Sequence, residues 1–570
     1  MDHPVSIESK GREKRKYDAI VIGSGISGGW AAKELCEKGL KTLVLERGGK
    51  MDHVTDYHTA LKDPWDLPHR NTPTYADKQA NPIQSKCYAW TEATQHLFVK
   101  DEEHPYTQVK PFDWIRGYQV GGKSIMWARQ CYRWSGLDFN ANAKDGFGIP
   151  WPITYDEIAP WYSYVEKFAG ISGNKDGLPH LPDGEFLPPM EMNCVERDLK
   201  LKLESRFPGR PMIMGRAANH TRAVEGRGPC VYRNLCHRGC PFGGYFSSNS
   251  ATLPAAMATK KMTLRPQSIV HSIIYDQKKQ RAKGVRVIDA VTKEMQEYYA
   301  KIIFVNASTL NSALILLNST SHRFPNGLGN DGDVLGRYLM AHNYRVRLNG
   351  LIDGYEDVYY SGRRPNSPYI PRFRNIGDDQ RNDFVRGYAY GFSASRQGWQ
   401  RGMNTADFGA EFKDALSKPG PWTVVMYAMG EMLPDANNRV TLDHVNTDQW
   451  GMPTLQIDCI WKTNEDAMSA DALETGKEIL EAMGVKDIQG QDNHQAPGLD
   501  IHEMGCARMG SDPKTSVVNK FNQVHGCPNV FVTDGACMTS TACQNPSVTY
   551  MAFTARACSY AVNELKKQNL

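Results

Sequence analysis

The stretch YDAIVIGSGISGGWAAKELCEKGLKTLVLERGG, residues 17–49, carries the strongest structural signal in the chain. Residues 19–22 are a short apolar run, typical of a buried parallel strand. Three glycines then fit the pattern G-x-G-x-x-G. In this pattern Gly23 permits a tight turn, Gly25 lets the backbone approach a pyrophosphate, and Gly28 allows close packing of helix on strand.

The residues that follow complete a βαβ unit. Residues 27–38 are expected to form a helix that ends at Gly39, and residues 42–45 a second strand. Glu46, eighteen residues after Gly28, stands where a carboxylate can accept hydrogen bonds from ribose hydroxyls. This order of elements predicts a site for the ADP part of a dinucleotide, but does not by itself choose between NAD and FAD.

Two distant glycine-containing segments favour FAD. RGYQVGGKSIMWA (residues 116–128) and the segment 528–557 are typical of loops that bring backbone close to a cofactor. The second segment predicts a strand at 529–533, an Asp-Gly turn, and a helix from about Ser547. The N-terminus of that helix would suit the negative charge that a flavin ring develops on reduction.

Composition limits the class of protein. The 570 residues exceed the size of a single core, so at least two domains are expected. A net charge of +4 gives no indication of a nucleic-acid partner, and the basic run at 10–16 is expected to be a solvated tail. No apolar run is long enough for a transmembrane segment, and no signal peptide is expected. The odd count of 13 cysteines favours a reducing compartment and mostly free thiols.

Taken together, these segments resemble the glucose–methanol–choline (GMC) flavoprotein oxidoreductases over most of the chain. The matching segments are VIGSGISGG, VGGKSIMWA, KIIFVNASTLNSALILLNS, DVLGRYLMAH, HEMGCARMG and TDGACMTSTACQNPSVT. The resemblance implies an α/β fold with a Rossmann-like FAD-binding domain and a discontinuous β-sheet substrate domain. We assign residues 17–136, 225–345 and 495–570 to the FAD-binding domain and residues 137–224 and 346–494 to the substrate-binding domain.

The resemblance also implies a set of FAD-binding residues. It places the ADP part on Gly23, Ser24, Gly25, Gly28 and Glu46, the ribityl chain and ring on Gly121, Gly122, Ser124 and Met126, the adenine at Val270, and the pyrophosphate near Asp534 and Gly535. Asn545 is assigned both to the cofactor site and to catalysis.

The same resemblance identifies His502 and Asn545 as the catalytic pair. Oxidising an alcohol removes a hydroxyl proton while hydride leaves the carbon, and a neutral imidazole is a suitable base near pH 7. An asparagine amide can hold the same oxygen in line. The alternative is that His502 is a buried histidine that only packs and forms hydrogen bonds in the core. Its segment, HEMGC, is not the H-E-x-x-H of a zinc protease.

Three cysteines fall within GPCVYRNLCHRGCPFGG, residues 228–244. The spacing of Cys230, Cys236 and Cys240 does not match zinc-finger pairs, but fits a loop that offers three thiolates to an iron–sulfur cluster, expected to be of the 3Fe–4S type. The same arrangement occurs in the iron–sulfur sugar dehydrogenases of the GMC family. The alternatives are zinc with His237 as a further ligand, a disulfide with one free thiol, and cysteines with only a structural role. No acidic residue lies between Glu225 and Asp276, which suits an anionic cluster.

The sequence therefore predicts an FAD-dependent sugar dehydrogenase. We expect it to oxidise a ring hydroxyl of a glucoside, at C3, and to pass electrons through the cluster to a cytochrome or quinone. A small partner subunit with an export signal would allow a periplasmic location, and otherwise the protein is expected in the cytoplasm. Alternatives are a glucose 1-dehydrogenase, a gluconate dehydrogenase large subunit, a GMC oxidase that uses oxygen, and a flavin module without catalysis.

Aromatic and glycine-rich stretches lie between the cofactor segments. One of them, DVYYSGRRPNSPYIPRFRN (residues 357–375), could form the wall of a sugar site, because aromatic faces pack on C–H surfaces while polar side chains bond hydroxyls. The alternative is an ordinary sheet face with its loops. Residues 150–173 are expected to contain an amphipathic helix.

Overall fold

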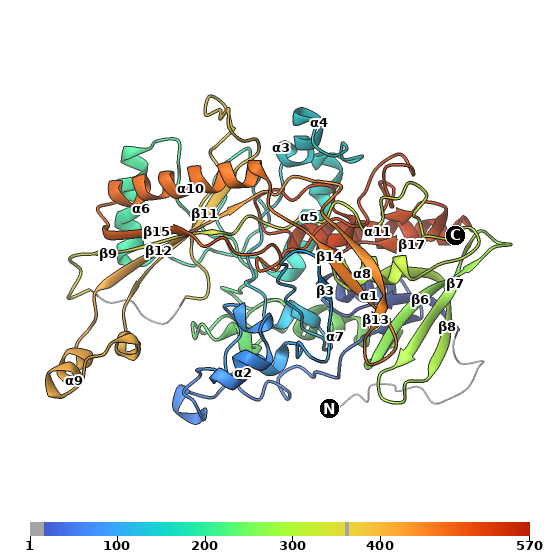
Figure 1. Cartoon of the computed structure of the whole chain (residues 1–570), viewed down its shortest axis with the longest axis horizontal. Helices are drawn as coiled ribbons and strands as arrows, with labels where there is room; N and C mark the ends of the chain where they lie inside the picture. The colour runs from blue at the N-terminus through green and yellow to red at the C-terminus, as the bar shows by residue number, and fades with distance from the viewer. Residues whose placement is uncertain (1–15, 359–363) are drawn as a thin grey trace.

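The computed structural model describes residues 16–358 and 364–570, so residues 10–15 of the basic run and part of the aromatic stretch 357–375 lie outside the described residues, whereas Lys16 begins the first strand. The chain is arranged around two large sheets, seen at opposite ends of the molecule in Figure 1. The helices are α1 (Ile26–Glu37), α2 (Tyr75–Ala80), α3 (Gly136–Phe139), α4 (Ala141–Asp145), α5 (Tyr155–Ala169), α6 (Cys194–Arg206), α7 (Leu253–Ala258), α8 (Thr309–Leu317), α9 (Ala410–Ser417), α10 (Thr463–Ala482) and α11 (Ser547–Lys566).

The first sheet has eight strands. They are β1 (Lys16–Ile22), β2 (Thr42–Leu45), β5 (Met262–Arg265), β6 (Ser268–Asp276), β7 (Arg281–Asp289), β8 (Met295–Val305), β16 (Gln523–Val524) and β17 (Cys527–Val532). Its parallel part has the order β17-β8-β1-β2-β5. Strand β7 extends it by antiparallel pairing with the first half of β8, and β6 pairs antiparallel with β7.

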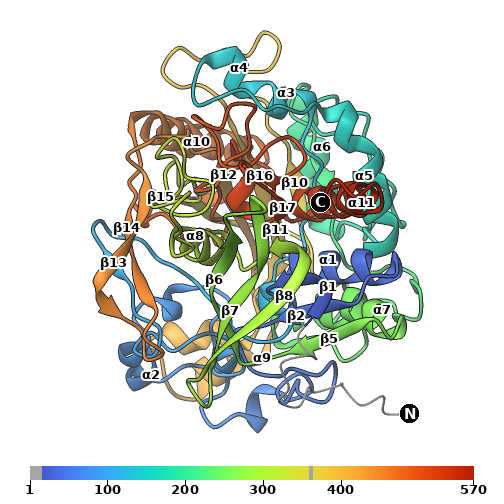
Figure 2. The same cartoon turned by 90° about the vertical axis from the view of Figure 1, so that its right-hand side faces the viewer.

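The predicted βαβ unit is confirmed. Strand β1 covers the apolar run, and α1 occupies 26–37, one residue earlier than expected. Gly39 follows with φ +92°, a left-handed conformation that ends the helix without a side-chain clash. β2 occupies 42–45 and pairs in parallel with β1. The helix expected from Ser547 is α11, which packs with α1 and α5 beside the sheet (Figure 2).

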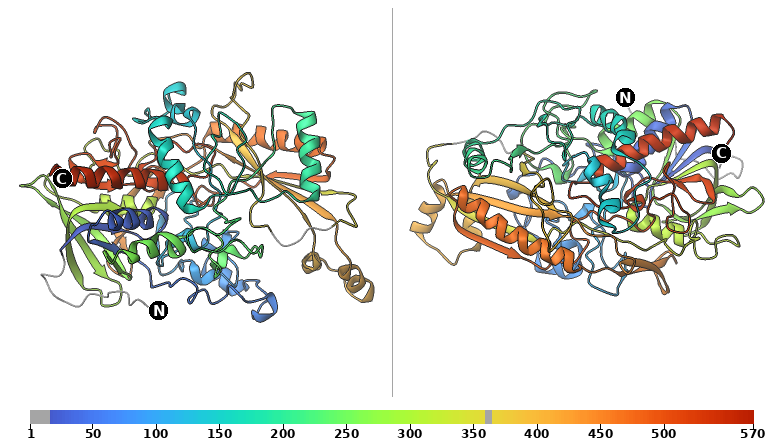
Figure 3. Two further views of the ribbon diagram at one scale, coloured as in Figure 1. Left: turned by 180° about the vertical axis from the view of Figure 1, so that it is seen from behind. Right: turned by 90° about the horizontal axis from the view of Figure 1, so that it is seen from above.

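The second sheet has six antiparallel strands in the order β15-β9-β12-β11-β10-β4. They are β4 (Ile213–Met214), β9 (Val346–Ile352), β10 (Pro368–Ile370), β11 (Tyr388–Arg396), β12 (Trp422–Gly430) and β15 (Lys486–Asp492). Helices α6 and α10 lie against this sheet (Figures 1 and 3). Leu199, Phe392 and Ile479 belong to the buried apolar cluster that joins helices to strands.

A third, small sheet connects distant parts of the chain. It consists of β3 (Thr107–Gln108), β13 (Arg439–Thr447) and β14 (Pro453–Asp458). The eight-stranded sheet takes its strands from residues 16–45, 262–305 and 523–532, and the six-stranded sheet from residues 213–214, 346–430 and 486–492. The division into two domains at the stated boundaries stays a prediction.

The amphipathic helix expected within 150–173 is α5. Thr154 caps it, accepting a hydrogen bond from the backbone N–H of Glu157, so the helix begins where a cap satisfies its first free donors. No helix in the described ranges combines the length and apolar character needed to span a bilayer.

Candidate active site

One large cavity lies at the carboxyl ends of the parallel strands. Its walls include residues 23–27 after β1, Glu46 and Arg47 after β2, residues 306–309 after β8, and Asp534 and Gly535 after β17. In open α/β sheets this is the edge at which ligands bind. The cavity volume of about 1560 Å³ exceeds the range of about 300–1,000 Å³ typical of a site for one small ligand. It has room for a dinucleotide and a substrate together.

The turn after β1 is built for close backbone approach. Gly23 has φ +94°, and a Cβ there would lie 2.3 Å from the carbonyl oxygen of Asn306. At Gly25, by contrast, the nearest atom to an added Cβ would be 4.0 Å away, so its side-chain position opens into free space. Helix α1 begins at the next residue, with backbone N–H groups of its first turn available to an anion.

Glu46 is held by the same turn. Its carboxylate accepts hydrogen bonds from Ser24 N (3.1 Å), Ser24 Oγ (2.6 Å) and Gly48 N (2.9 Å). Burial raises the pKa of Glu46, and these three donors oppose that rise because they favour the charged form. Both Ser24 and Glu46 line the cavity.

Most of the other predicted cofactor residues also line the cavity: Gly122, Ser124, Met126, Val270, Asp534, Gly535 and Asn545. Gly28 and Gly121 do not. A Cβ on Gly28 would lie 2.0 Å from the carbonyl oxygen of Gly23, and one on Gly121 would lie 1.6 Å from Asn249 Oδ1. Close packing therefore accounts for these two glycines, and their contact with a cofactor stays a prediction.

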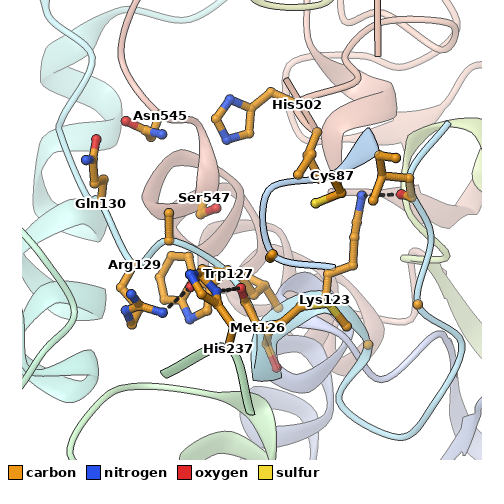
Figure 4. A pocket seen from close by; sticks show the side chains of 18 of the residues that line it. Cys87, Lys123, Met126, Trp127, Arg129, Gln130, His237, His502, Asn545 and Ser547 are labelled. Atoms are coloured by element: carbon orange, nitrogen blue, oxygen red, sulfur yellow. Dashed lines mark hydrogen bonds between the residues drawn. The ribbon is translucent and has the colours of Figure 1, made fainter. Parts of the chain in front are cut away.

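His502 and Asn545 reach the cavity from separate segments and lie on one side of it in Figure 4. Asn545 comes just before Pro546, which caps α11. Among the described residues no hydrogen bond occupies its amide group, which leaves the amide available to a ligand. Met126 and Trp127 lie on the opposite side of the cavity in the same view.

A second histidine, which the sequence did not single out, contacts His502. Nδ1 of His342 lies 2.9 Å from Nδ1 of His502. His342 ends the segment DVLGRYLMAH, so the family resemblance had reached it without indicating a role. Burial lowers the pKa of His342 to about 4 and places that of His502 well below its usual range. Both imidazoles are therefore neutral near pH 7.

Asp500, His342 and His502 form a group of three potential metal ligands, with one ligand atom of each residue within 4.8 Å of the other two. It is the one such group found among the described residues. A tetrahedral zinc ion with bonds of about 2.0–2.1 Å would hold two nitrogens about 3.4 Å apart. The observed 2.9 Å is a hydrogen-bond length. Asp500 Oδ2 already accepts the backbone N–H groups of His342 (2.7 Å) and His502 (3.2 Å). The group is a hydrogen-bonded assembly and not a metal site.

Several polar atoms of the cavity wall are buried without a hydrogen-bond partner in the part of the chain described. They include Tyr550 Oη, Glu503 Oε1 and Asn366 Oδ1. An unpaired buried polar atom costs about 1–3 kcal/mol. A bound polar ligand would remove that cost, so these atoms fit a cavity that is filled in the working protein. Lys123, on the same wall, lies 3.5 Å from the other oxygen of Glu503.

Aromatic and amide side chains line the cavity together with His502 and Asn545. Tyr344 and Tyr427 pack edge to face with ring centroids 5.0 Å apart. Gln130 donates a hydrogen bond of 3.2 Å to the Tyr427 hydroxyl, and Figure 4 shows Gln130 close to Asn545. All of these side chains line the cavity. This combination of ring faces and hydrogen-bonding groups suits a polyhydroxylated ligand.

The cysteine loop packs against the wall that carries Met126. Nδ1 of His237 lies 2.7 Å from the carbonyl oxygen of Met126, and the ring lines the cavity. Tyr245 donates from its hydroxyl to the carbonyl oxygens of Ile125 and Cys236. Nδ1 of His237 is thus engaged at the cavity wall, and this contact joins the cysteine loop to Met126.

All thirteen cysteines are free thiols, so the disulfide alternative is not supported. Tetrahedral Zn–S bonds of about 2.3 Å would bring sulfurs to about 3.8 Å of one another. The sulfurs of Cys230, Cys236 and Cys240 do not all lie within 4.8 Å, so no assembled zinc site is present among the described residues. Backbone N–H groups of Tyr232 and Gly244 donate to two of the sulfurs, at 3.4 and 3.3 Å.

Comparison with known proteins gives a family and a fold. Family models described as GMC oxidoreductase match residues 17–343 and 434–554. The chain is 26% identical to the fructose dehydrogenase large subunit of Gluconobacter japonicus, over 97% of this chain and 99% of that protein. It is 28% identical to 2-methyl-1,2-propanediol dehydrogenase of Mycolicibacterium austroafricanum, over 95% and 94%.

Among solved structures, pyridoxine 4-oxidase from Mesorbium loti superposes with a TM-score of 0.60 at 16% identity, covering 95% of this chain and 98% of that one. This likeness confirms the predicted α/β fold, with several sheets.

Proposed function

Because this chain belongs to the GMC oxidoreductase family, whose members bind FAD and oxidise CH–OH groups, we propose that it is an FAD-dependent dehydrogenase of a sugar ring hydroxyl. The observation that carries the proposal is that His502 and Asn545 line the same cavity as the glycine turn. The similarity to a fructose dehydrogenase large subunit supports a sugar substrate.

The residues present fit FAD. The turn at Gly23–Gly25 and the start of α1 would hold its pyrophosphate, and Glu46 its ribose. Met126 and Ser124 would lie along the ribityl chain and ring. When bound, FAD supplies the hydride acceptor, the N5 atom of its ring.

The chain's own residues supply the proton chemistry. His502 is neutral near pH 7 and exposed to the cavity, so it can accept the hydroxyl proton of the substrate as the C–H hydride leaves. Asn545 can donate from its amide to the same oxygen and hold it in line. Tyr344 and Tyr427 offer ring faces and edges to the C–H surface of a sugar.

We further propose a glucoside as substrate and C3 as the carbon oxidised. The cysteine spacing, which resembles that of glucoside 3-dehydrogenases, supports this choice. The test compares methyl glucoside, glucose, fructose, gluconate and 2-methyl-1,2-propanediol in an assay of dye reduction. Preference for methyl glucoside, with NMR of the product placing the carbonyl at C3, is expected. Reduction by free glucose alone would instead favour attack at the anomeric carbon, and activity only with the diol would reject a sugar.

Cys230, Cys236 and Cys240 are proposed to hold an iron–sulfur cluster. The backbone N–H groups that donate to Cys230 and Cys240 and the nearby Arg129 suit anionic sulfurs. A cluster would carry single electrons to an external acceptor, for which we propose a cytochrome or quinone, with a small partner subunit. Iron and sulfide analysis of protein purified without oxygen tests the cluster, and absence of both rejects it. Rapid oxygen consumption with peroxide release would identify an oxidase instead.

A further inference from the structure

His342 is completely buried and does not line the cavity, yet it is the side chain that contacts the proposed base. The two imidazole rings stand nearly perpendicular, at 87°, with centroids 5.0 Å apart. The Nδ1–Nδ1 distance of 2.9 Å requires one nitrogen to carry a hydrogen and the other a lone pair. The direction of this hydrogen bond determines which nitrogen of His502 can act as a base.

The other nitrogen of His342 fixes that direction. His342 Nε2 lies 2.9 Å from the carbonyl oxygen of Ala542 and 3.3 Å from that of Thr541. Carbonyl oxygens only accept hydrogen bonds, so Nε2 must carry the hydrogen. In a neutral imidazole Nδ1 then holds the lone pair. The opposite arrangement would set the Nε2 lone pair against two carbonyl oxygens in a buried site.

We propose that His342 is a positioning residue that holds His502 in the tautomer with hydrogen on Nδ1 and a free Nε2 lone pair. This inference rests on the proposed function for its catalytic meaning. His502 Nδ1–H donates to His342 Nδ1, and Nε2 is left without a partner among the described residues. In the proposed reaction the substrate O–H bond breaks and an Nε2–H bond forms, while the C–H hydride goes to the bound flavin.

The backbone holds this arrangement in place. Asp500 Oδ2 accepts from the backbone N–H groups of both histidines, at 2.7 and 3.2 Å. Ile501, between Asp500 and His502, has φ +68°, and Ala542 has φ +52°. Left-handed conformations are rare for such residues, above all for a β-branched one, and they persist where the surroundings impose them. Ala542 supplies the carbonyl oxygen at one end of the hydrogen-bonded chain through His342, and Ile501 directly precedes His502 at the other end.

The charged groups near His502 do not offer another partner for its Nδ1. Asp500 uses Oδ2 for backbone donors and Oδ1 for Gly498 N, at 3.2 Å. Glu503 pairs with Lys123 through Oε2, at 3.5 Å, and its Oε1 makes no hydrogen bond to His502. His342 is therefore the one acceptor that the described residues provide for Nδ1–H of His502.

The first test measures the tautomer in the resting holoenzyme. ¹⁵N NMR of histidine-labelled protein, with His502→Ala used to assign its signals, is expected to show His502 protonated on Nδ1 and unprotonated on Nε2. The reverse pattern would overturn the proposal. Because this measurement needs no substrate, it stands even if no sugar reduces the flavin, in which case the proposed function fails alone.

The second test compares two substitutions at the same position. His342→Asn keeps an amide oxygen that can accept from His502, whereas His342→Phe removes the acceptor and preserves the ring volume. We expect His342→Phe to lower kcat about 10- to 100-fold, the effect of an unpaired buried donor, with KM within about threefold. His342→Asn is expected to keep kcat within about fivefold.

Equal losses in the two variants, or kcat of His342→Phe within twofold of the parent, would contradict the proposal. Flavin content and thermal melting are measured alongside. If His342→Phe does not fold, the ¹⁵N spectrum of His342→Asn decides: His502 must remain protonated on Nδ1.

Discussion

The Ser24 hydroxyl donates a hydrogen bond of 2.6 Å to the Glu46 carboxylate, which joins the glycine turn to the end of β2. Two backbone N–H groups, those of Ser24 and Gly48, donate to the same carboxylate. The carboxylate is therefore held in place without a ligand, at the position that we propose for contact with a ribose.

Replacing Glu46 by Gln is expected to weaken FAD binding at least about tenfold, because hydrogen bonds to a charged acceptor contribute about 1.5–3 kcal/mol. Fluorescence titration of flavin-depleted protein measures the Kd. Glu294→Gln, an exposed glutamate remote from the cavity, is the matched control. An unchanged Kd for Glu46→Gln would remove Glu46 from the cofactor site.

His502→Ala is expected to lower kcat by about 100- to 10,000-fold, the usual contribution of a positioned base. The amount of bound flavin should not change. Steady-state dye reduction and the flavin absorbance give the two quantities, with the exposed His322→Ala as control. Turnover within threefold of the parent would show that another group is the base, or that the protein is a flavin module without catalysis.

Asn545→Ala is expected to reduce kcat/KM about 10- to 100-fold, because the substrate oxygen loses one hydrogen-bond donor in a buried site. Asn545 makes no hydrogen bond within the described residues, so folding should be little affected. Thermal melting checks this, and Asn326→Ala on the exposed surface is the control. Loss of flavin without loss of substrate affinity would point to a cofactor role instead.

The pH dependence of stability should report the buried imidazole of His342. Its folded-state pKa is about 4, against 6.5 in an unfolded chain, so the unfolded state binds more protons between these values. The free energy of unfolding should therefore fall, relative to His342→Asn, as pH drops from about 6.5 to 4, by up to about 1.4 kcal/mol per pH unit.

Asp500 has the opposite effect on the pH dependence of stability, because burial raises its pKa to about 7. The parent and His342→Asn both retain Asp500, so its effect cancels in the comparison. Denaturant unfolding at several pH values measures the difference. Parallel pH profiles for the two proteins would contradict a buried neutral His342.

Cys230→Ser is expected to lower the iron content of anaerobically purified protein while leaving FAD bound, since no cysteine of the loop lines the cavity. Metal and sulfide analysis with a flavin absorbance spectrum measures both. Cys194→Ser, outside the loop, is the control. Equal iron in both variants would exclude Cys230 as a ligand.

Contiguous sequence determined the local parts of this protein. The apolar run, Gly23 and Gly39 require a strand, a left-handed turn and a helix stop over a few residues, whatever the rest of the chain does. The family motifs likewise led to His502 and Asn545, because each lies in a short segment that can be compared directly.

Only the tertiary structure decided which distant groups meet. His342 and His502 are 160 residues apart, and nothing in either segment specifies their hydrogen bond or the carbonyl that orients it. Packing also placed Gly121 in a close contact with Asn249, and set the cysteine loop against Met126. Turn and helix preferences act between neighbours in the chain, whereas these contacts arise only when separate segments pack together.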